Sequence, residues 1–177
     1  VLGKDEIAVF DAGFKLVEAT EVDIERCLIR LAKNCTFGKT AGRIPERPSE
    51  KGGIPTQYKA EIVRPLARQH GGKTLPATAA DKICTMTDES AREIEVHIWY
   101  KLYFLERQLS AVTNKRKKHE LRHMPLKVMA IYDPDYDEPL LVGTPLLSLE
   151  PDAAYKIYVT RWPVEGLPQA GKYILSG

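Results

Sequence analysis

Four side chains near the end of the sequence have the types and the spacing of a site for phosphate and metal. Tyr158, Arg161, Glu165 and Lys172 follow the pattern Y-x2-R-x3-E-x6-K. Because each residue of an α-helix is rotated by about 100° from the last, the four would share one stripe about 60° wide. A carboxylate flanked by a phenol, a guanidinium and an ammonium indicates a site that holds a metal ion and a phosphate backbone. The spacing fits an ordinary amphipathic helix with i, i+4 charge pairs equally well.

A second candidate lies near the start of the chain. The apolar run Ile7–Phe10 ends at Asp11 and is followed closely by Gly13, which favours a buried strand and a turn. An acid at the carboxyl end of a buried strand projects into the cleft where ligands bind in α/β sheets. The alternative is that Asp11 forms a turn or caps a helix.

Taken together, these two stretches resemble bacterial insertion-sequence transposases of the DDE type (the IS-four-like superfamily), which carry a Tyr-Arg-Glu-Lys signature. The resemblance implies an α/β fold, a partial RNase H-like core with a mixed sheet and helices, interrupted by a β-rich insertion. It implies that Asp11 is the second catalytic acid and Glu165 the third, and that both bind Mg²⁺ or Mn²⁺. A two-metal site is expected only in the complete protein. Tyr158, Arg161 and Lys172 would position phosphates of the transposon ends.

Hydrophobic periodicity predicts the elements that carry these residues. Residues 6–10 and 24–31 read as strands, with a short helix over 14–19 between them, and Arg30 in the second strand is either a phosphate contact or a water-facing charge. Strict alternation over 94–105 predicts a strand whose opposite face carries Glu95, His97, Trp99, Lys101 and Tyr103. Strands over 126–132 and 139–142 complete an antiparallel meander. A terminal helix begins at Glu150.

A basic segment rich in glycine and proline lies between these strands. Its composition over 34–75 points to loops and short strands. Arg64, Arg68 and Lys73 resemble basic positions that recur in the insertion of a transposase subgroup, and would contact DNA phosphates; a solvated basic loop is the alternative. We therefore expect three parts: 1–33 with the second acid, 34–124 as the insertion, and 125–177 with the third acid.

One further motif has a different chemistry. His119, Glu120 and His123 match H-E-x-x-H, the zinc site of metallopeptidases. The run Lys115-Arg116-Lys117-Lys118 before it concentrates positive charge beside a cation site, and Pro125 stops a helix soon after. A polar turn is the plain interpretation, and a phosphate contact by the basic run is a third.

The bulk properties fit a globular chain. Charged residues are 28%, hydrophobic residues 44% and the net charge is +2. Three widely spaced cysteines predict neither a disulfide framework nor a zinc ribbon, and favour reduced cytoplasmic thiols. We find no signal peptide and no apolar run of the roughly 20 residues that cross a bilayer.

The family implies DNA partners (transposon ends and target), a homodimer in the full-length protein and a bacterial, nucleoid-associated location. Both ends of the sequence look cut, and the first catalytic Asp of the family is not found. We therefore expect a transposase fragment that performs no strand transfer alone, which an assay with transposon-end DNA and Mg²⁺ tests. Pro163, Pro168, Gly166 and Gly171 interrupt the signature helix, as in a decayed element. The alternatives are a non-catalytic DNA-binding remnant and a zinc metallopeptidase.

Overall fold

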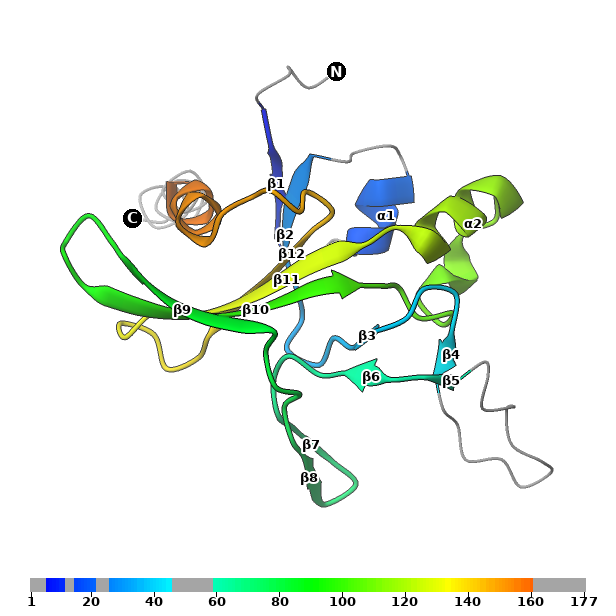
Figure 1. The fold of residues 1–177 in the computed structure, drawn as a ribbon, viewed down its shortest axis with the longest axis horizontal. Helices are drawn as coiled ribbons and strands as arrows, with labels where there is room; N and C mark the ends of the chain where they lie inside the picture. The colour runs from blue at the N-terminus through cyan, green and yellow to red at the C-terminus, as the bar shows by residue number, and fades with distance from the viewer. Residues whose placement is uncertain (1–5, 12–14, 22–25, 46–58, 161–177) are drawn as a thin grey trace, which may run out of the picture.

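A six-stranded mixed sheet forms the centre of the molecule (Figure 1). The computed structural model describes residues 6–11, 15–21, 26–45 and 59–160. In sheet order the strands are β1 (Ala8–Phe10), β2 (Cys27–Arg30), β12 (Leu140–Thr144), β11 (Leu126–Tyr132), β10 (Glu93–Leu102) and β9 (Lys82–Thr87). The pair β1 and β2 is parallel and every other neighbouring pair is antiparallel. The fold is therefore mixed α/β, with a main β-sheet and a few helices.

The parallel pair is built by a short crossover. Helix α1 (Leu16–Glu21) connects β1 to β2, because two parallel neighbours cannot be joined by a tight hairpin. Leu16, Val17 and Ala19 of α1 are buried. The two strands and the helix expected from the sequence are present, with bounds a few residues shorter or shifted.

The antiparallel half of the sheet follows the predicted meander, with two differences. Strand β9 was not predicted; it is an edge strand of largely exposed residues, so it lacks a clear apolar pattern. In β10 the prediction placed Trp99 on the face opposite the alternating apolar residues, beside His97 and Lys101, and its ring is buried there. The indole Nε1 donates to the carbonyls of Thr78 (3.2 Å) and Ala79 (3.0 Å), so a distant segment covers that face.

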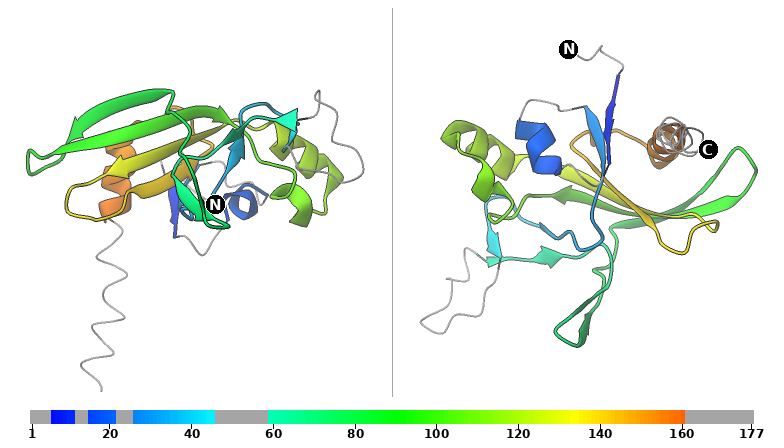
Figure 2. Two further views of the ribbon diagram at one scale, coloured as in Figure 1. Left: turned by 90° about the horizontal axis from the view of Figure 1, so that it is seen from below. Right: turned by 180° about the vertical axis from the view of Figure 1, so that it is seen from behind.

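Each face of the sheet is covered by helices (Figures 1 and 2). On one face lie α1, the helix α2 (Lys115–His123) and the 3-10 helix η2 (Leu109–Ala111). On the other lies a helix over residues 151–160, where Ala154 and Tyr158 pack with Leu28, Met129 and Val142. No helix in the described ranges is long and apolar enough to cross a membrane.

The segment rich in glycine and proline forms short strands, as predicted. These are β3 (Phe37–Gly38), β4 (Ile44–Pro45), β5 (Lys59–Ala60), β6 (Ile62–Val63), β7 (Arg68–His70) and β8 (Lys73–Leu75). β7 and β8 form a hairpin that extends away from the main sheet (Figures 1 and 2). Its turn residues Gly71 and Gly72 have φ of 56° and 73°, as a two-residue type I′ turn requires.

Helix α2 stands where the sequence predicted a polar turn. Asn114 caps its start, with the side chain accepting a hydrogen bond from the Lys117 amide at 3.1 Å. The helix ends at His123, two residues before Pro125, where the proline was expected to stop it. The turn interpretation failed because a single buried side chain, Leu121, gives the helix too little apolar periodicity to recognise.

Candidate functional site

Asp11 and Arg30 lie side by side at one end of the parallel pair. Asp11 directly follows β1 and Arg30 ends β2, so both side chains leave the sheet at its carboxyl edge. Arg30 Nη1 lies 3.6 Å from Asp11 Oδ1, and the two side chains are 40% and 43% exposed. An exposed ion pair contributes only about 0–1 kcal/mol. Either partner can therefore exchange its contact for a ligand.

A groove of about 670 Å³ runs beside Arg30. Its lining includes Arg30 and Lys33, from β2 and the segment after it, and three acids near the turn between β11 and β12, Asp133, Asp137 and Glu138. Lys33 and Glu138 form an ion pair across it. Among the described residues the lining therefore holds two cationic and three acidic side chains, and Arg30 is the cationic group in it that does not pair with the turn acids.

Tyr158 is the only member of the Tyr-Arg-Glu-Lys pattern within the described residues. Arg161, Glu165 and Lys172 lie outside them. Tyr158 lines the groove next to Val159, but the residue is only 9% exposed, because its ring packs on the sheet. The structure therefore gives Tyr158 a packing role that the sequence did not indicate, and brings it into the same groove as Arg30.

An ion cluster holds the helix over 151–160 against two turns. Arg92 Nη2 lies 2.6 Å from Asp88, and Nη1 pairs with Asp135 and lies 3.9 Å from Asp133. The Tyr155 hydroxyl donates a hydrogen bond to Asp133, and burial raises the pKa of this hydroxyl above its ordinary value. The sequence predicted a turn at 133–137 but not this contact, since its partners are far apart along the chain.

Lys127 is a second residue that sequence reasoning missed. It sits in the apolar run of β11 and is 1% exposed. Its Nζ donates to the carbonyls of Leu147 (3.2 Å) and Leu149 (2.6 Å), in the segment that leads into the helix over 151–160. Burial lowers the pKa of Lys127. A charged residue inside an apolar strand was the available signal.

Two of the three predicted basic residues in the insertion lie at the base of the β7–β8 hairpin. Arg68 Nη1 donates to the Asn34 carbonyl at 3.0 Å, which brings the hairpin base to the segment just after β2. Within the described part of the chain, the buried Nε atoms of Arg64 and Arg68 have no hydrogen-bond partner. Lys73 is exposed at the start of β8. Basic groups therefore follow one path from Arg30 to the hairpin.

The H-E-x-x-H residues lie on helix α2. The His119 and His123 rings are 4.8 Å apart, whereas Glu120 pairs with Arg116 at 3.1 Å. The acids considered as a third ligand belong to the distant β11–β12 turn, where Arg92 and Lys33 bind two of them. Over the described ranges, no three His, Cys, Asp or Glu side chains are grouped to hold a metal.

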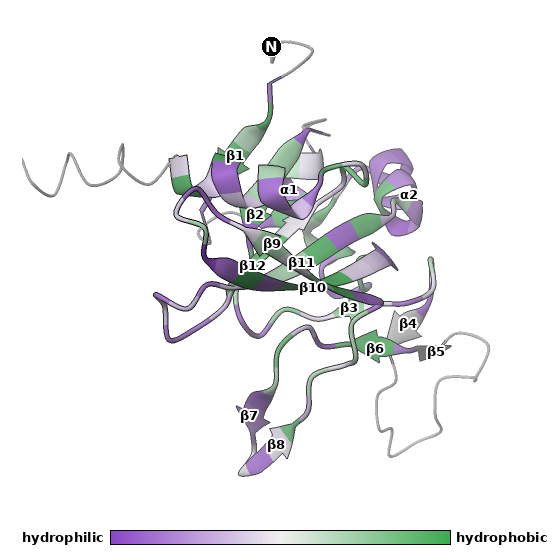
Figure 3. Ribbon diagram, turned by 60° about the vertical axis from the view of Figure 1, so that its left-hand side comes forward, coloured by the Kyte–Doolittle hydropathy of each residue, from purple (hydrophilic) through white to green (hydrophobic). Residues whose placement is uncertain are grey.

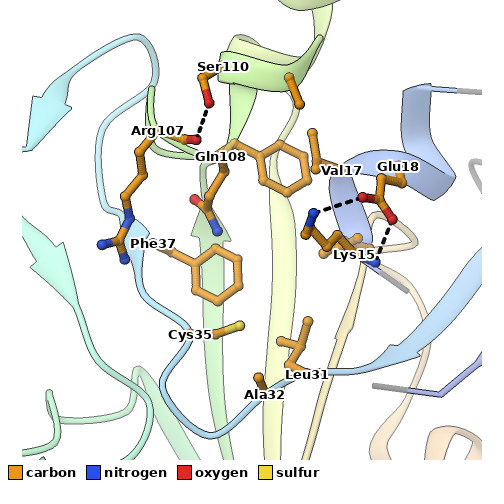
Figure 4. Close-up of a pocket in the computed structure, with 13 residues that line it drawn as sticks. Lys15, Val17, Glu18, Leu31, Ala32, Cys35, Phe37, Arg107, Gln108 and Ser110 are labelled. Carbon is orange, nitrogen blue, oxygen red and sulfur yellow. Dashed lines mark hydrogen bonds and ion pairs between the residues drawn. The ribbon is translucent and has the colours of Figure 1, made fainter. Parts of the chain in front are cut away.

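A second cavity, of about 390 Å³, lies on the opposite face between α1, η2 and the segment after β2 (Figure 4). Its floor is apolar, and its polar rim is engaged internally. Lys15 pairs with Glu18 at 3.0 Å, and Arg107 donates to the Thr36 hydroxyl. Burial raises the pKa of the Cys35 thiol, which keeps it a poor nucleophile. We therefore assign the candidate site to the groove at Arg30.

Comparisons of the chain with protein-family models, with curated proteins and with solved structures found no match.

Proposed function

We propose that the chain carries the second and third catalytic acids of a DDE transposase, on a partial RNase H-like core that a β-rich insertion interrupts. One observation carries this proposal. Asp11 and Arg30 meet at the carboxyl edge of two parallel strands, and the helix over 151–160 brings Tyr158 into the groove beside Arg30. In the family that the sequence resembles, a strand-end acid and a Tyr-Arg-Glu-Lys helix build the catalytic centre on one sheet.

Asp11 and Glu165 are the residues that would hold Mg²⁺ or Mn²⁺. Carboxylate oxygens are the hard ligands that these ions prefer. Asp11 supplies a carboxylate that is 43% exposed, so a metal ion can reach it. When bound, a metal pair stabilises the charge on the attacking and leaving oxygens of a phosphodiester. Arg30 would then release Asp11 and contact a phosphate.

The proposed DNA contacts extend beyond the acids. Arg30, Arg64, Arg68 and Lys73 would neutralise phosphates along the path from β2 to the hairpin. Tyr158, Arg161 and Lys172 would position the transposon ends. The proposed partners are transposon-end and target DNA, together with a second copy of the protein that pairs two ends.

Metal binding by the full chain tests this function. Because the metal pair is expected only in the complete protein, we expect this chain to bind a single Mn²⁺ ion in the presence of duplex DNA. Asp11→Asn and Glu165→Gln should each weaken that binding roughly tenfold or more. Glu93→Gln, which removes an exposed carboxylate on β10, is the matched control. Equal Mn²⁺ affinity in all four proteins would refute a shared site of Asp11 and Glu165.

DNA binding separates the catalytic proposal from the non-catalytic remnant. Measured by fluorescence anisotropy across 50–200 mM salt, the affinity should fall steeply, and the double variant Arg30→Gln/Lys73→Gln should reduce the log–log slope by about 1.8, or 0.9 per phosphate contact. Salt-dependent DNA binding, together with Mn²⁺ affinity that Asp11→Asn leaves unchanged, would favour the non-catalytic DNA-binding remnant.

A further inference from the structure

Helix α2 carries a concentration of positive charge that does not stabilise the helix itself. Its sequence KRKKHELRH holds five cationic side chains and one acid. Arg116 is 91% exposed and Lys115 is also exposed. In Figure 3 the helix is hydrophilic along nearly its whole length. Leu121 is the one buried side chain of the helix, and the other side chains of the helix are largely basic.

The placement of these charges costs the helix stability. Lys115, Arg116 and Lys117 occupy the first turn, which has no acid, whereas the helix dipole favours negative charge there by about 0.3–1 kcal/mol per group. Lys115 and Lys118 are also three residues apart, and Lys118 and Arg122 four apart, which adds repulsion between like charges. Lys115 and Arg116 in the first turn therefore gain nothing from the helix dipole.

Nearby acids compensate the charge only in part. Glu106 lies 3.0 Å from Lys118 and 2.9 Å from Arg122, and Glu120 lies 3.1 Å from Arg116. Glu120 also lies 3.9 Å from Lys117, so among the described residues two acids pair with four of the five cations. At the other end of the helix the loop at Gly42 packs closely, because a Cβ at Gly42 would lie 3.5 Å from the His123 ring.

The outward surface of α2 fits a polyanion better than it fits other partners. A membrane-bound helix needs bulky apolar side chains on one face, and a protein interface needs an apolar core. The single apolar side chain of α2 is buried in the body of the molecule. Nine residues span about 13 Å at 1.5 Å per residue, the rise of roughly four phosphates along one DNA strand.

We propose that α2 contacts the sugar–phosphate backbone of duplex DNA through Lys115 and Arg116, at a surface separate from the groove at Arg30. The two surfaces lie on opposite faces of the sheet, since Leu121 packs on one face and Tyr158 on the other. This inference rests on the proposed function for the identity of the polyanion. It adds a second DNA contact that the Tyr-Arg-Glu-Lys pattern does not include.

The test is the double variant Lys115→Ala/Arg116→Ala in the full chain. If each side chain contacts one phosphate, the slope of log affinity against log salt should fall by about 1.8, and the affinity in 0.1 M salt by about 60-fold. The melting temperature should stay constant or rise, because alanine is a better helix former and the repulsion with the dipole is removed. The control Lys82→Ala/Lys101→Ala removes the same charge from β9 and β10 and should bind like the unsubstituted chain.

Several outcomes overturn the inference. Unchanged affinity and slope in Lys115→Ala/Arg116→Ala would exclude α2 while leaving the proposed function standing, provided that Arg30→Gln/Lys73→Gln still weakens binding. Equal losses in the control would show a general effect of net charge. Tighter binding of single-stranded RNA than of duplex DNA would assign α2 to another nucleic acid. If the unsubstituted chain binds no DNA, this inference and the DNA contacts of the proposed function both fail.

Discussion

Replacing Lys127 with methionine removes the buried charge that ties β11 to the segment before the helix over 151–160. Each hydrogen bond from a charged donor contributes about 1.5–3 kcal/mol, while desolvation of the ammonium costs several kcal/mol. The Lys127 Nζ also lies 5.3 Å from the centre of the Tyr100 ring, a contact of about 1 kcal/mol. Methionine preserves most of the volume but leaves the carbonyls of Leu147 and Leu149 without this donor. We expect Lys127→Met to lower the free energy of unfolding by about 2–4 kcal/mol.

The lowered pKa of Lys127 also sets the direction in which the cost of Lys127→Met changes with pH. Because the pKa of Lys127 is lowered in the folded chain from its ordinary 10.5, the unfolded chain binds more protons between the two values. The pH-dependent part of the stability contributed by Lys127 is therefore fully present above pH 10.5 and is lost as the pH falls through the folded pKa, whereas the hydrogen bonds of the charged amine persist. The cost of Lys127→Met should consequently increase as the pH rises towards 10.5.

Urea unfolding at neutral and alkaline pH measures both effects. Lys73→Met, at an exposed position of the hairpin, is the control and should leave the free energy of unfolding unchanged. Hydrogen exchange over 151–160 should accelerate in Lys127→Met alone. Equal stability of Lys127→Met and the unsubstituted chain, or a cost that shrinks with rising pH, would refute this account of the lysine.

Two further substitutions test the packing around the candidate site. Tyr155→Phe removes the hydroxyl that donates to the buried Asp133 and should cost about 1–3 kcal/mol by urea unfolding, whereas Tyr136→Phe, on an exposed ring in the same turn, should cost nothing measurable. Gly143→Ala would place a Cβ 2.9 Å from Leu31 Cδ1 and should cost about 1–3 kcal/mol. Adding Leu31→Ala makes room, so the double variant should lose less stability than the sum of the two single changes; strict additivity would contradict the contact.

The elements that sequence reasoning found are those with a regular apolar pattern. Alternation identified β10, and β11 was predicted with its observed bounds. The strand, helix and strand of the β1–α1–β2 unit followed from short apolar runs punctuated by glycine and acid. Such patterns show which face of an element is buried. They therefore predict whether a segment is a helix or a strand better than they predict which elements it packs against.

The features that the sequence did not predict depend on contacts between residues that are far apart along the chain. Alternation placed Trp99 on the face opposite the apolar set, but it gave no sign that the segment at Thr78 and Ala79 covers this residue. Helix α2 was missed because charge, rather than apolar spacing, dominates its composition. In the candidate site, Asp11 and Arg30 were each singled out, but their pairing needed the parallel register of β1 and β2.

A single strand sets the position of Tyr158 relative to Arg30. Lys127 lies near the start of β11 and binds the segment before the helix over 151–160, while Asp133 follows the end of β11 and binds Tyr155 within that helix. These contacts span 20 to 22 residues. They join a strand whose sequence is apolar except for Lys127 to the helix that carries Tyr158. Sequence periodicity does not reveal contacts between such distant residues. The motif alone therefore does not show which residues orient the helix. The polar contacts of Lys127 and Asp133, one near each end of β11, act together with the apolar packing of Ala154 and Tyr158 to fix how the helix meets the groove.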